Sequence, residues 1–89
     1  MAKRGKLEIM KDILSLIKDN RKSIKITPLI RKSNLSTIRF REYYSELIEK
    51  GLVLEKTSGS NKIVFLTEKG IKFIEKYRTI VDFIEEFEL

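Results

Sequence analysis

Apolar residues recur every three or four positions in the first part of the chain and then change to strict alternation. Between Leu7 and Asp19 the apolar side chains are separated by Glu, Lys, Asp and Ser, a spacing that predicts an amphipathic helix. The next segment, SIKIT, alternates apolar and polar residues. Ile24 and Ile26 therefore predict a short strand or an extended link after the first helix.

Two further helices are predicted between Thr27 and Gly51. The Thr27 hydroxyl is placed to cap a short helix, PLIRKS, with Pro28 at its first position, where the missing N–H costs nothing. Residues 34–35 are expected to form a turn, and Ser36 is expected to cap the next helix. That helix contains TIRFREYYSELIEK and is predicted to end at Gly51, because glycine readily adopts the left-handed conformation that stops a helix.

Two β-rich runs and a long helix complete the predicted order of elements. LVLEK and KIVFL are separated by TSGSN, whose small residues suit a hairpin loop, so the two runs should pair antiparallel. Thr67 is expected to cap a helix from about Glu68 to Glu88, with Gly70 tolerated in its first turn. A chain of 89 residues buries only a modest core, which indicates one domain with an appendage.

Composition excludes several kinds of chemistry. The chain has no Cys and no His, so it lacks disulfides, the usual zinc ligands, thiol nucleophiles and the commonest general base. We expect no enzymatic activity, metal or cofactor, and we interpret Glu42, Glu46 and Glu49 as a solvated helix face. No apolar run is long enough to cross a bilayer and no signal peptide is visible, so a cytoplasmic protein without membrane contact is expected.

The net charge of +6 is concentrated in the first half of the chain. Residues 1–50 hold 13 Lys and Arg against 6 acids, whereas residues 51–89 hold 6 against 7. Between residues 21 and 41 no acid occurs, and the basic residues there are Arg21, Lys22, Lys25, Arg31, Lys32, Arg39 and Arg41. Such a block is either a solvated face or a surface that faces a polyanion, and its density favours the second interpretation.

The order of elements resembles that of a winged helix-turn-helix domain. The resemblance rests on the two-helix unit from Thr27 to Gly51, on EKGLV entering the first wing strand and on FLTEKG leaving the second. The size of about ten kilodaltons, the basic first half and the single long last helix are similar to those of archaeal winged-helix DNA-binding proteins.

This resemblance implies a mainly α fold with a small β-hairpin. A winged-helix DNA-binding domain would span residues 1–67, and the last helix, residues 68–89, would join two chains through an antiparallel coiled coil. The resemblance also implies a homodimer that binds double-stranded DNA as a transcription regulator or a chromatin-associated protein, in the cytoplasm with the nucleoid.

The second helix of a helix-turn-helix enters the major groove with its first residues at the base edges. With Phe40 facing inward, a rotation of about 100° per residue places three more side chains on the core side, Tyr43, Tyr44 and Leu47. We therefore prefer core positions for the tyrosines over stacking on bases. On the opposite side, arginine can donate two hydrogen bonds to guanine, isoleucine can contact a thymine methyl, and hydroxyls can reach phosphate. The alternative for Arg39 and Arg41 is ion pairing along the helix.

The hairpin loop is the second candidate contact region. Lys56 and Lys62 flank TSGSN, which is either a wing that follows the adjacent minor groove or an ordinary exposed turn. Lys3, Arg4 and Lys6 form either a phosphate-contacting arm or a solubilising start. The predicted DNA contacts are Arg31, Lys32, Ser36, Thr37, Ile38, Arg39, Arg41, Ser45, Lys56 and Lys62.

The last helix carries a stripe with heptad spacing. The predicted dimerisation residues, separated by 4, 3, 4 and 3 positions, are Phe73, Tyr77, Ile80, Ile84 and Phe87. Ile71, Ile74 and Val81 widen the stripe toward the domain. The alternative is a helix that folds back on its own domain, but a rod of about twenty residues, roughly 30 Å, is longer than one face of so small a body.

A second function fits the same elements. A winged-helix module of a larger assembly would dock its aromatic last helix on a different protein, and alone it would be a monomer that binds DNA weakly. No effector pocket is evident in the sequence, so we expect no small-molecule ligand.

Overall fold

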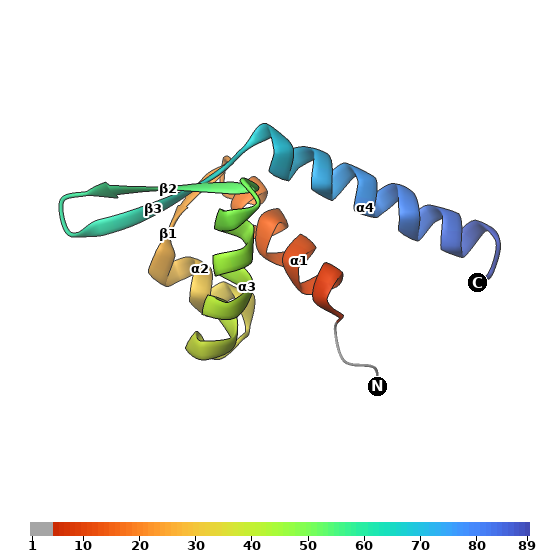
Figure 1. Ribbon diagram of the computed structural model, residues 1–89, viewed down its shortest axis with the longest axis horizontal. Helices are drawn as coiled ribbons and strands as arrows, with labels where there is room; N and C mark the ends of the chain where they lie inside the picture. The colour runs from red at the N-terminus through yellow and green to blue at the C-terminus, as the bar shows by residue number, and fades with distance from the viewer. Residues whose placement is uncertain (1–4) are drawn as a thin grey trace.

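The computed structural model describes residues 5–89, so Lys3 and Arg4 of the suggested N-terminal arm lie outside the described residues. Along the described chain the elements follow in the order helix, strand, helix, helix, strand, strand and a long final helix (Figure 1). Their bounds are α1 Lys6–Asp19, β1 Ser23–Lys25, α2 Ile26–Ser33, α3 Thr37–Glu49, β2 Val53–Ser58, β3 Asn61–Leu66 and α4 Glu68–Glu86.

The strands form one antiparallel sheet in the order β1-β3-β2. The predicted hairpin is therefore confirmed as β2 and β3, and β1 adds a third strand through pairs such as Ile24 with Val64. Figure 1 shows the hairpin extending past α2 and α3 on one side of the molecule, while α4 extends on the other. This arrangement gives the chain extents of 49 × 28 × 21 Å.

The start of α2 differs from the prediction. The helix begins at Ile26, its N-cap is Lys25 in extended conformation, and no side chain caps it, so the predicted Thr27 cap is wrong. The reason is tertiary: Lys25 is held in β1 by pairing with Ile63, and the helix starts directly after it. Pro28 becomes the third helical residue, where its missing N–H still costs nothing because the first four N–H groups of a helix have no intrahelical partner.

The ends of α3 and the start of α4 confirm the predicted signals. The Ser36 hydroxyl accepts a hydrogen bond from the Arg39 amide at 3.2 Å, and Gly51 follows the helix with a φ of 74°. The Thr67 hydroxyl accepts from the Gly70 amide at 3.1 Å and donates to the Gly51 carbonyl at 2.7 Å. One threonine thus ties the start of α4 to the end of α3.

The hairpin turn is tighter than predicted. Ser58 pairs with Asn61, so three residues of TSGSN belong to the strands and only Gly59 and Ser60 form the turn. Gly59 has a φ of 62°, which two-residue hairpin turns favour because it matches the twist of the strands. The strands therefore run nearly to the tip.

The core lies between α1, α3 and the inner face of the sheet. Its buried side chains are Ile9, Met10, Ile13, Leu14, Ile17, Ile24, Leu29, Phe40, Leu47, Leu52, Val53, Val64 and Leu66. Phe40 and Leu47 are buried as predicted, and Tyr43 and Tyr44 are half-buried at the margin of this core. The direction assigned to α3 from its periodicity is therefore confirmed.

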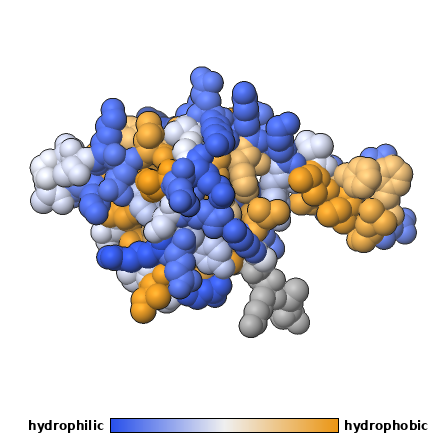
Figure 2. Space-filling view, viewed as in Figure 1, coloured by the Kyte–Doolittle hydropathy of each residue, from blue (hydrophilic) through white to orange (hydrophobic). Residues whose placement is uncertain are grey.

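The first half of α4 covers the domain, and its second half does not. Ile71, Phe73 and Ile74 pack against the core, and α4 lies along α1. Toward the C-terminus the large apolar side chains are exposed, among them Phe83 at 55% and Phe87 at 57%. Figure 2 shows apolar atoms gathered on this protruding end of the helix.

Gly70 is expected to be essential for the seating of α4. A Cβ atom at this position would collide with the Leu52 carbonyl oxygen and lie 2.6 Å from Leu66 Cδ1. Leu52 is held by its backbone, since its carbonyl accepts from the Thr67 amide and its amide donates to the Leu47 carbonyl. We expect Gly70→Ala to lower the free energy of unfolding by about 2 kcal/mol, the range of overpacked sites.

Chemical denaturation of Gly70→Ala and of Lys72→Ala measures this effect. Lys72 is exposed in the same helix, so its alanine variant should stay within about 0.5 kcal/mol of the parent. Helix propensity alone predicts the opposite sign for Gly70→Ala, a gain of about 1 kcal/mol. A Gly70→Ala protein as stable as the parent would contradict the close packing.

Candidate nucleic-acid interface

The turn between α2 and α3 is fixed by two serines. Asn34 ends α2 in the left-handed conformation with a φ of 60°. The buried Ser33 hydroxyl donates to the Ile30 carbonyl at 2.6 Å and accepts from the Leu35 amide at 3.3 Å. Ser36 then caps α3, so its hydroxyl is already engaged with the Arg39 amide. Together these bonds set the angle at which α3 leaves the turn.

The first two turns of α3 present an exposed face. Ile38 is 74% exposed, on the side of the helix away from the buried Phe40 and Leu47. Four more predicted contact residues are exposed beside it: Thr37, Arg39, Arg41 and Ser45. The structure thus brings the predicted residues of α3 to one surface.

Arg39 and Arg41 are available for a partner. Arg39 donates to the Tyr43 hydroxyl at 3.3 Å, and its guanidinium carbon lies 5.9 Å from the centre of the Tyr43 ring. Within residues 5–89 neither arginine forms an ion pair with an acid. Glu46, an acid of the same helix, contacts Lys6 at 2.9 Å and Lys50 at 3.7 Å. The Lys6 contact lowers the pKa of the Glu46 carboxyl below its ordinary value.

Two further pairs of basic residues lie in different elements of the fold. Arg31 and Lys32 are exposed in the last turn of α2, next to the start of α3. Arg21 and Lys22 lie at the base of the sheet, where the Lys22 carbonyl accepts from the Leu66 amide. The basic residues of the acid-free block are thus distributed over the turn after α1, the end of α2 and the start of α3.

The hairpin contributes the remaining predicted contacts. Lys56 is exposed, with its Nζ 5.6 Å from the centre of the Phe65 ring. Lys62 is exposed and its Nζ lies 3.8 Å from Glu55 Oε2. At this separation and exposure the pair contributes little to stability.

Sequence reasoning missed a contact between α3 and the hairpin. The Tyr44 hydroxyl donates to Glu55 Oε1 at 2.7 Å, and the Tyr44 ring stacks on Phe40 with the ring centres 5.3 Å apart. Burial and the bond to Glu55 raise the pKa of the Tyr44 hydroxyl, so it stays a donor at any neutral pH. The available signal was the period of the strand, which puts Glu55 on the same side as the buried Val53.

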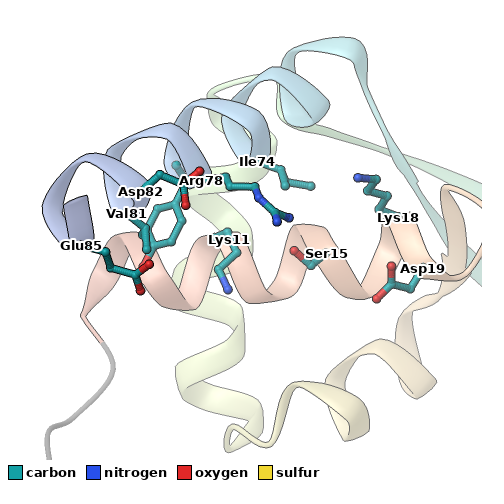
Figure 3. A pocket seen from close by; sticks show the side chains of 10 residues that line it. Lys11, Ser15, Lys18, Asp19, Ile74, Arg78, Val81, Asp82 and Glu85 are labelled. Atoms are coloured by element: carbon teal, nitrogen blue, oxygen red, sulfur yellow. The ribbon is translucent and has the colours of Figure 1, made fainter.

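A groove lies between α2, α3 and the hairpin. Its volume is about 370 Å³, and its lining includes Arg41, Tyr44, Ser45, Glu55 and Lys62. A second groove, of about 460 Å³, runs between α1 and α4 (Figure 3). Figure 3 shows Lys11, Ser15 and Lys18 of α1 beneath the α4 helix. Since Asp19, Asp82 and Glu85 also line this second groove, it has no excess of either charge.

The described residues contain neither a metal-binding group of side chains nor a membrane-spanning helix. No group of three or more acidic, Cys or His side chains in residues 5–89 could hold a metal ion. Over the same residues, no helix has the length and hydropathy needed to cross a membrane.

The predicted dimerisation residues are divided between two environments. Phe73 packs against the core, and the Tyr77 ring lies 5.4 Å from the Lys11 Nζ of α1. Ile80, Ile84 and Phe87 are exposed. Phe83, which the predicted seam did not include, is exposed as well and lies 4.9 Å from Phe87 between ring centres.

Several solved structures are similar to this chain. Sso10a-2, a DNA-binding protein from Sulfolobus solfataricus, is 27% identical with a TM-score of 0.80, covering 96% of this chain and 86% of that one. F-93 of SSV1 is 28% identical with a TM-score of 0.68, covering 89% of this chain and 91% of that one. F93 from STIV, a winged-helix DNA-binding protein, is 21% identical with a TM-score of 0.77 and the same coverages, which shows a shared fold.

A family model adds to these structural likenesses. None of the curated proteins matches the chain. The winged helix-turn-helix model matches residues 3–85, which span every helix and strand except the last residue of α4. The chain therefore belongs to the winged helix-turn-helix family.

Proposed function

We propose that the protein is a homodimer that binds double-stranded DNA with α3 in the major groove. The observation that carries this proposal is the exposed start of α3, where Ile38, Arg39 and Arg41 are all exposed. None of these three side chains is buried in the core. Base edges in the major groove present acceptors on guanine that can bind arginine and a thymine methyl that can contact isoleucine. Arg31 and Lys32, close to the same helix start, would contact phosphate and fix the orientation of the domain.

Two likenesses support DNA as the partner. Sso10a-2, of which this chain covers 86%, is a DNA-binding protein, and F93 from STIV is another. The formal net charge of +6 adds a sequence-independent attraction to a polyanion. We propose a role as a transcription regulator or as a nucleoid-associated protein of the cytoplasm.

The exposed half of α4 supports the dimer. Ile80, Phe83, Ile84 and Phe87 follow the spacing i, i+3, i+4 and i+7, so they form one apolar stripe, and no part of residues 5–89 covers it. An exposed stripe of this kind marks an interaction surface. We propose that residues 1–67 bind DNA and that α4 and its end, residues 68–89, join the two protomers.

The charges of α4 favour an antiparallel pairing. Its first half, residues 68–78, contains four basic residues and two acids, and its second half, residues 79–89, contains four acids and no basic residue. An antiparallel pair places each acidic half against the basic half of the other helix, whereas a parallel pair places the two acidic halves together. The acidic ends would also be repelled by DNA, so the pair belongs on the side away from the duplex.

Salt dependence tests the proposed function. A dimer that neutralises about six to ten phosphates should lose roughly a thousandfold or more in affinity between 50 and 200 mM salt. Fluorescence anisotropy with a labelled duplex measures this slope. An affinity that does not change over that range would contradict the proposal. A monomer that does not bind duplex at 50 mM salt would instead favour a module that docks on another protein.

A further inference from the structure

The hairpin beyond the sheet has little support of its own. β1 pairs with β3 only as far as Ile63, opposite Lys25, so the outer hairpin is a two-stranded ribbon. Its outer residues, 56–62, are all exposed. Two-stranded ribbons are only marginally stable in water, and they twist more than wider sheets do. The start of α2 lies beside the hairpin tip, since Thr27 and Pro28 line a groove together with Lys62, and a contact with α3 would fix the direction of the hairpin further.

One side-chain hydrogen bond supplies that contact. Within residues 5–89, the bond from Tyr44 to Glu55 is the only side-chain hydrogen bond that joins α3 to the hairpin. It acts at the middle of β2, outward from the buried Val53. The helix side of the contact is rigid, because the Tyr44 ring stacks on the buried Phe40.

We propose that Glu55 is a positioning residue that holds the wing, residues 56–62, at a fixed angle to the recognition helix α3. The inference rests on the proposed DNA-binding function, because the wing angle matters only if wing and helix contact one partner together. The carboxylate does this by accepting from the Tyr44 hydroxyl at 2.7 Å. A wing set in advance loses less conformational freedom when DNA binds, which increases affinity.

The carboxylate has an opposing electrostatic effect. Glu55 is the only acid that lines the groove between α2, α3 and the hairpin, and its Oε2 lies 3.8 Å from the Lys62 Nζ. Its charge therefore repels phosphate and weakens the attraction that Lys62 offers to DNA. Positioning by Glu55 should increase affinity while its charge lowers it, and substitution can separate the two.

Two variants of matched size separate these effects. Glu55→Gln and Glu55→Met both remove the charge and are similar in length, but only glutamine keeps an oxygen that accepts from Tyr44. Tyr44→Phe removes the donor and keeps the charge. Backbone amide relaxation of residues 57–60, measured by NMR without DNA, reports the order of the wing. Duplex affinity and its salt dependence report the consequence for binding.

We expect Glu55→Gln to keep an ordered wing and to bind duplex at least as tightly as the parent, with a slope on salt steeper by about one phosphate contact. Glu55→Met and Tyr44→Phe should have a more mobile wing, and Glu55→Met should bind about fivefold more weakly than Glu55→Gln.

Equal wing order in the glutamine, methionine and phenylalanine variants would overturn the proposal, and so would equal duplex affinity of Glu55→Gln and Glu55→Met. If neither the parent nor any variant binds duplex, the proposed function fails. The NMR measurement still shows whether Glu55 holds the wing.

Discussion

Replacing Arg39 and Arg41 together by alanine is expected to weaken duplex binding by roughly 100-fold or more. Two side chains that each contact a base or a phosphate contribute about 1–3 kcal/mol apiece, and 1.4 kcal/mol corresponds to a factor of ten. The fold should persist, because both residues are exposed and neither forms an ion pair within residues 5–89. Fluorescence anisotropy at constant salt measures the loss, and circular dichroism checks that the helix content of the protein is unchanged.

A matched control removes the same charge elsewhere. Lys11 and Lys18 of α1 line the groove between α1 and α4, so replacing both by alanine also lowers the net charge by two while leaving α3 and the residues of α4 unchanged. This control should weaken binding only slightly, through the general attraction to a polyanion. If the two double variants lose affinity equally, the arginines of α3 act only through net charge, and the proposed insertion of α3 is contradicted.

The same variant separates the two proposed roles. A random duplex and a duplex that carries the upstream region of the protein's own gene should bind alike if the protein coats DNA in general. A preference for the upstream duplex that disappears in the Arg39→Ala, Arg41→Ala protein would identify a regulator whose arginines read bases, because phosphate contacts carry no sequence information.

Local signals in the sequence predicted most of the elements that place this surface. The direction of α3 followed from its helical period alone, since Phe40 and Leu47 are buried and Ile38 is exposed. Ser36 and Thr67 cap their helices as their residue types predict. These features depend on residues within one or two turns of each other, so their prediction needs no knowledge of the tertiary fold.

Three of the features that were missed depend on contacts between distant segments. Thr27 does not cap α2, because pairing of Lys25 with Ile63 sets where β1 ends. The bond between Tyr44 and Glu55 joins a helix to a strand whose relative position follows only from the packed core. The predicted seam on α4 is shared between its own domain and solvent, since Phe73 packs inward and Ile80 is exposed. A heptad pattern shows that one face of a helix is apolar, but it does not show whether that face packs on its own domain or on another chain.

Substituting Ile80 by lysine is expected to separate the proposed dimer into monomers. Ile80 is exposed and lies close to the midpoint of residues 68–89, so an antiparallel pairing over that length brings the two Ile80 side chains close together. The substitution would bury two lysines side by side in place of the two isoleucines. The cost of burying these charges should raise the dimer dissociation constant by roughly 100-fold or more. Ile80 is exposed within one chain, so the domain itself should keep its stability.

Sedimentation equilibrium of Ile80→Lys beside Thr79→Lys measures this effect. Thr79 is the neighbouring residue, exposed and about 100° away around the helix, so its lysine adds the same charge off the seam and should leave the dimer intact. A monomer also loses the second α3, and two linked contacts exceed one by roughly 100-fold or more. Ile80→Lys should therefore bind duplex more weakly even though it gains a positive charge. Because the added positive charge alone would strengthen duplex binding, weaker binding cannot result from the change in net charge. An Ile80→Lys protein that remains dimeric would contradict the proposed interface on α4.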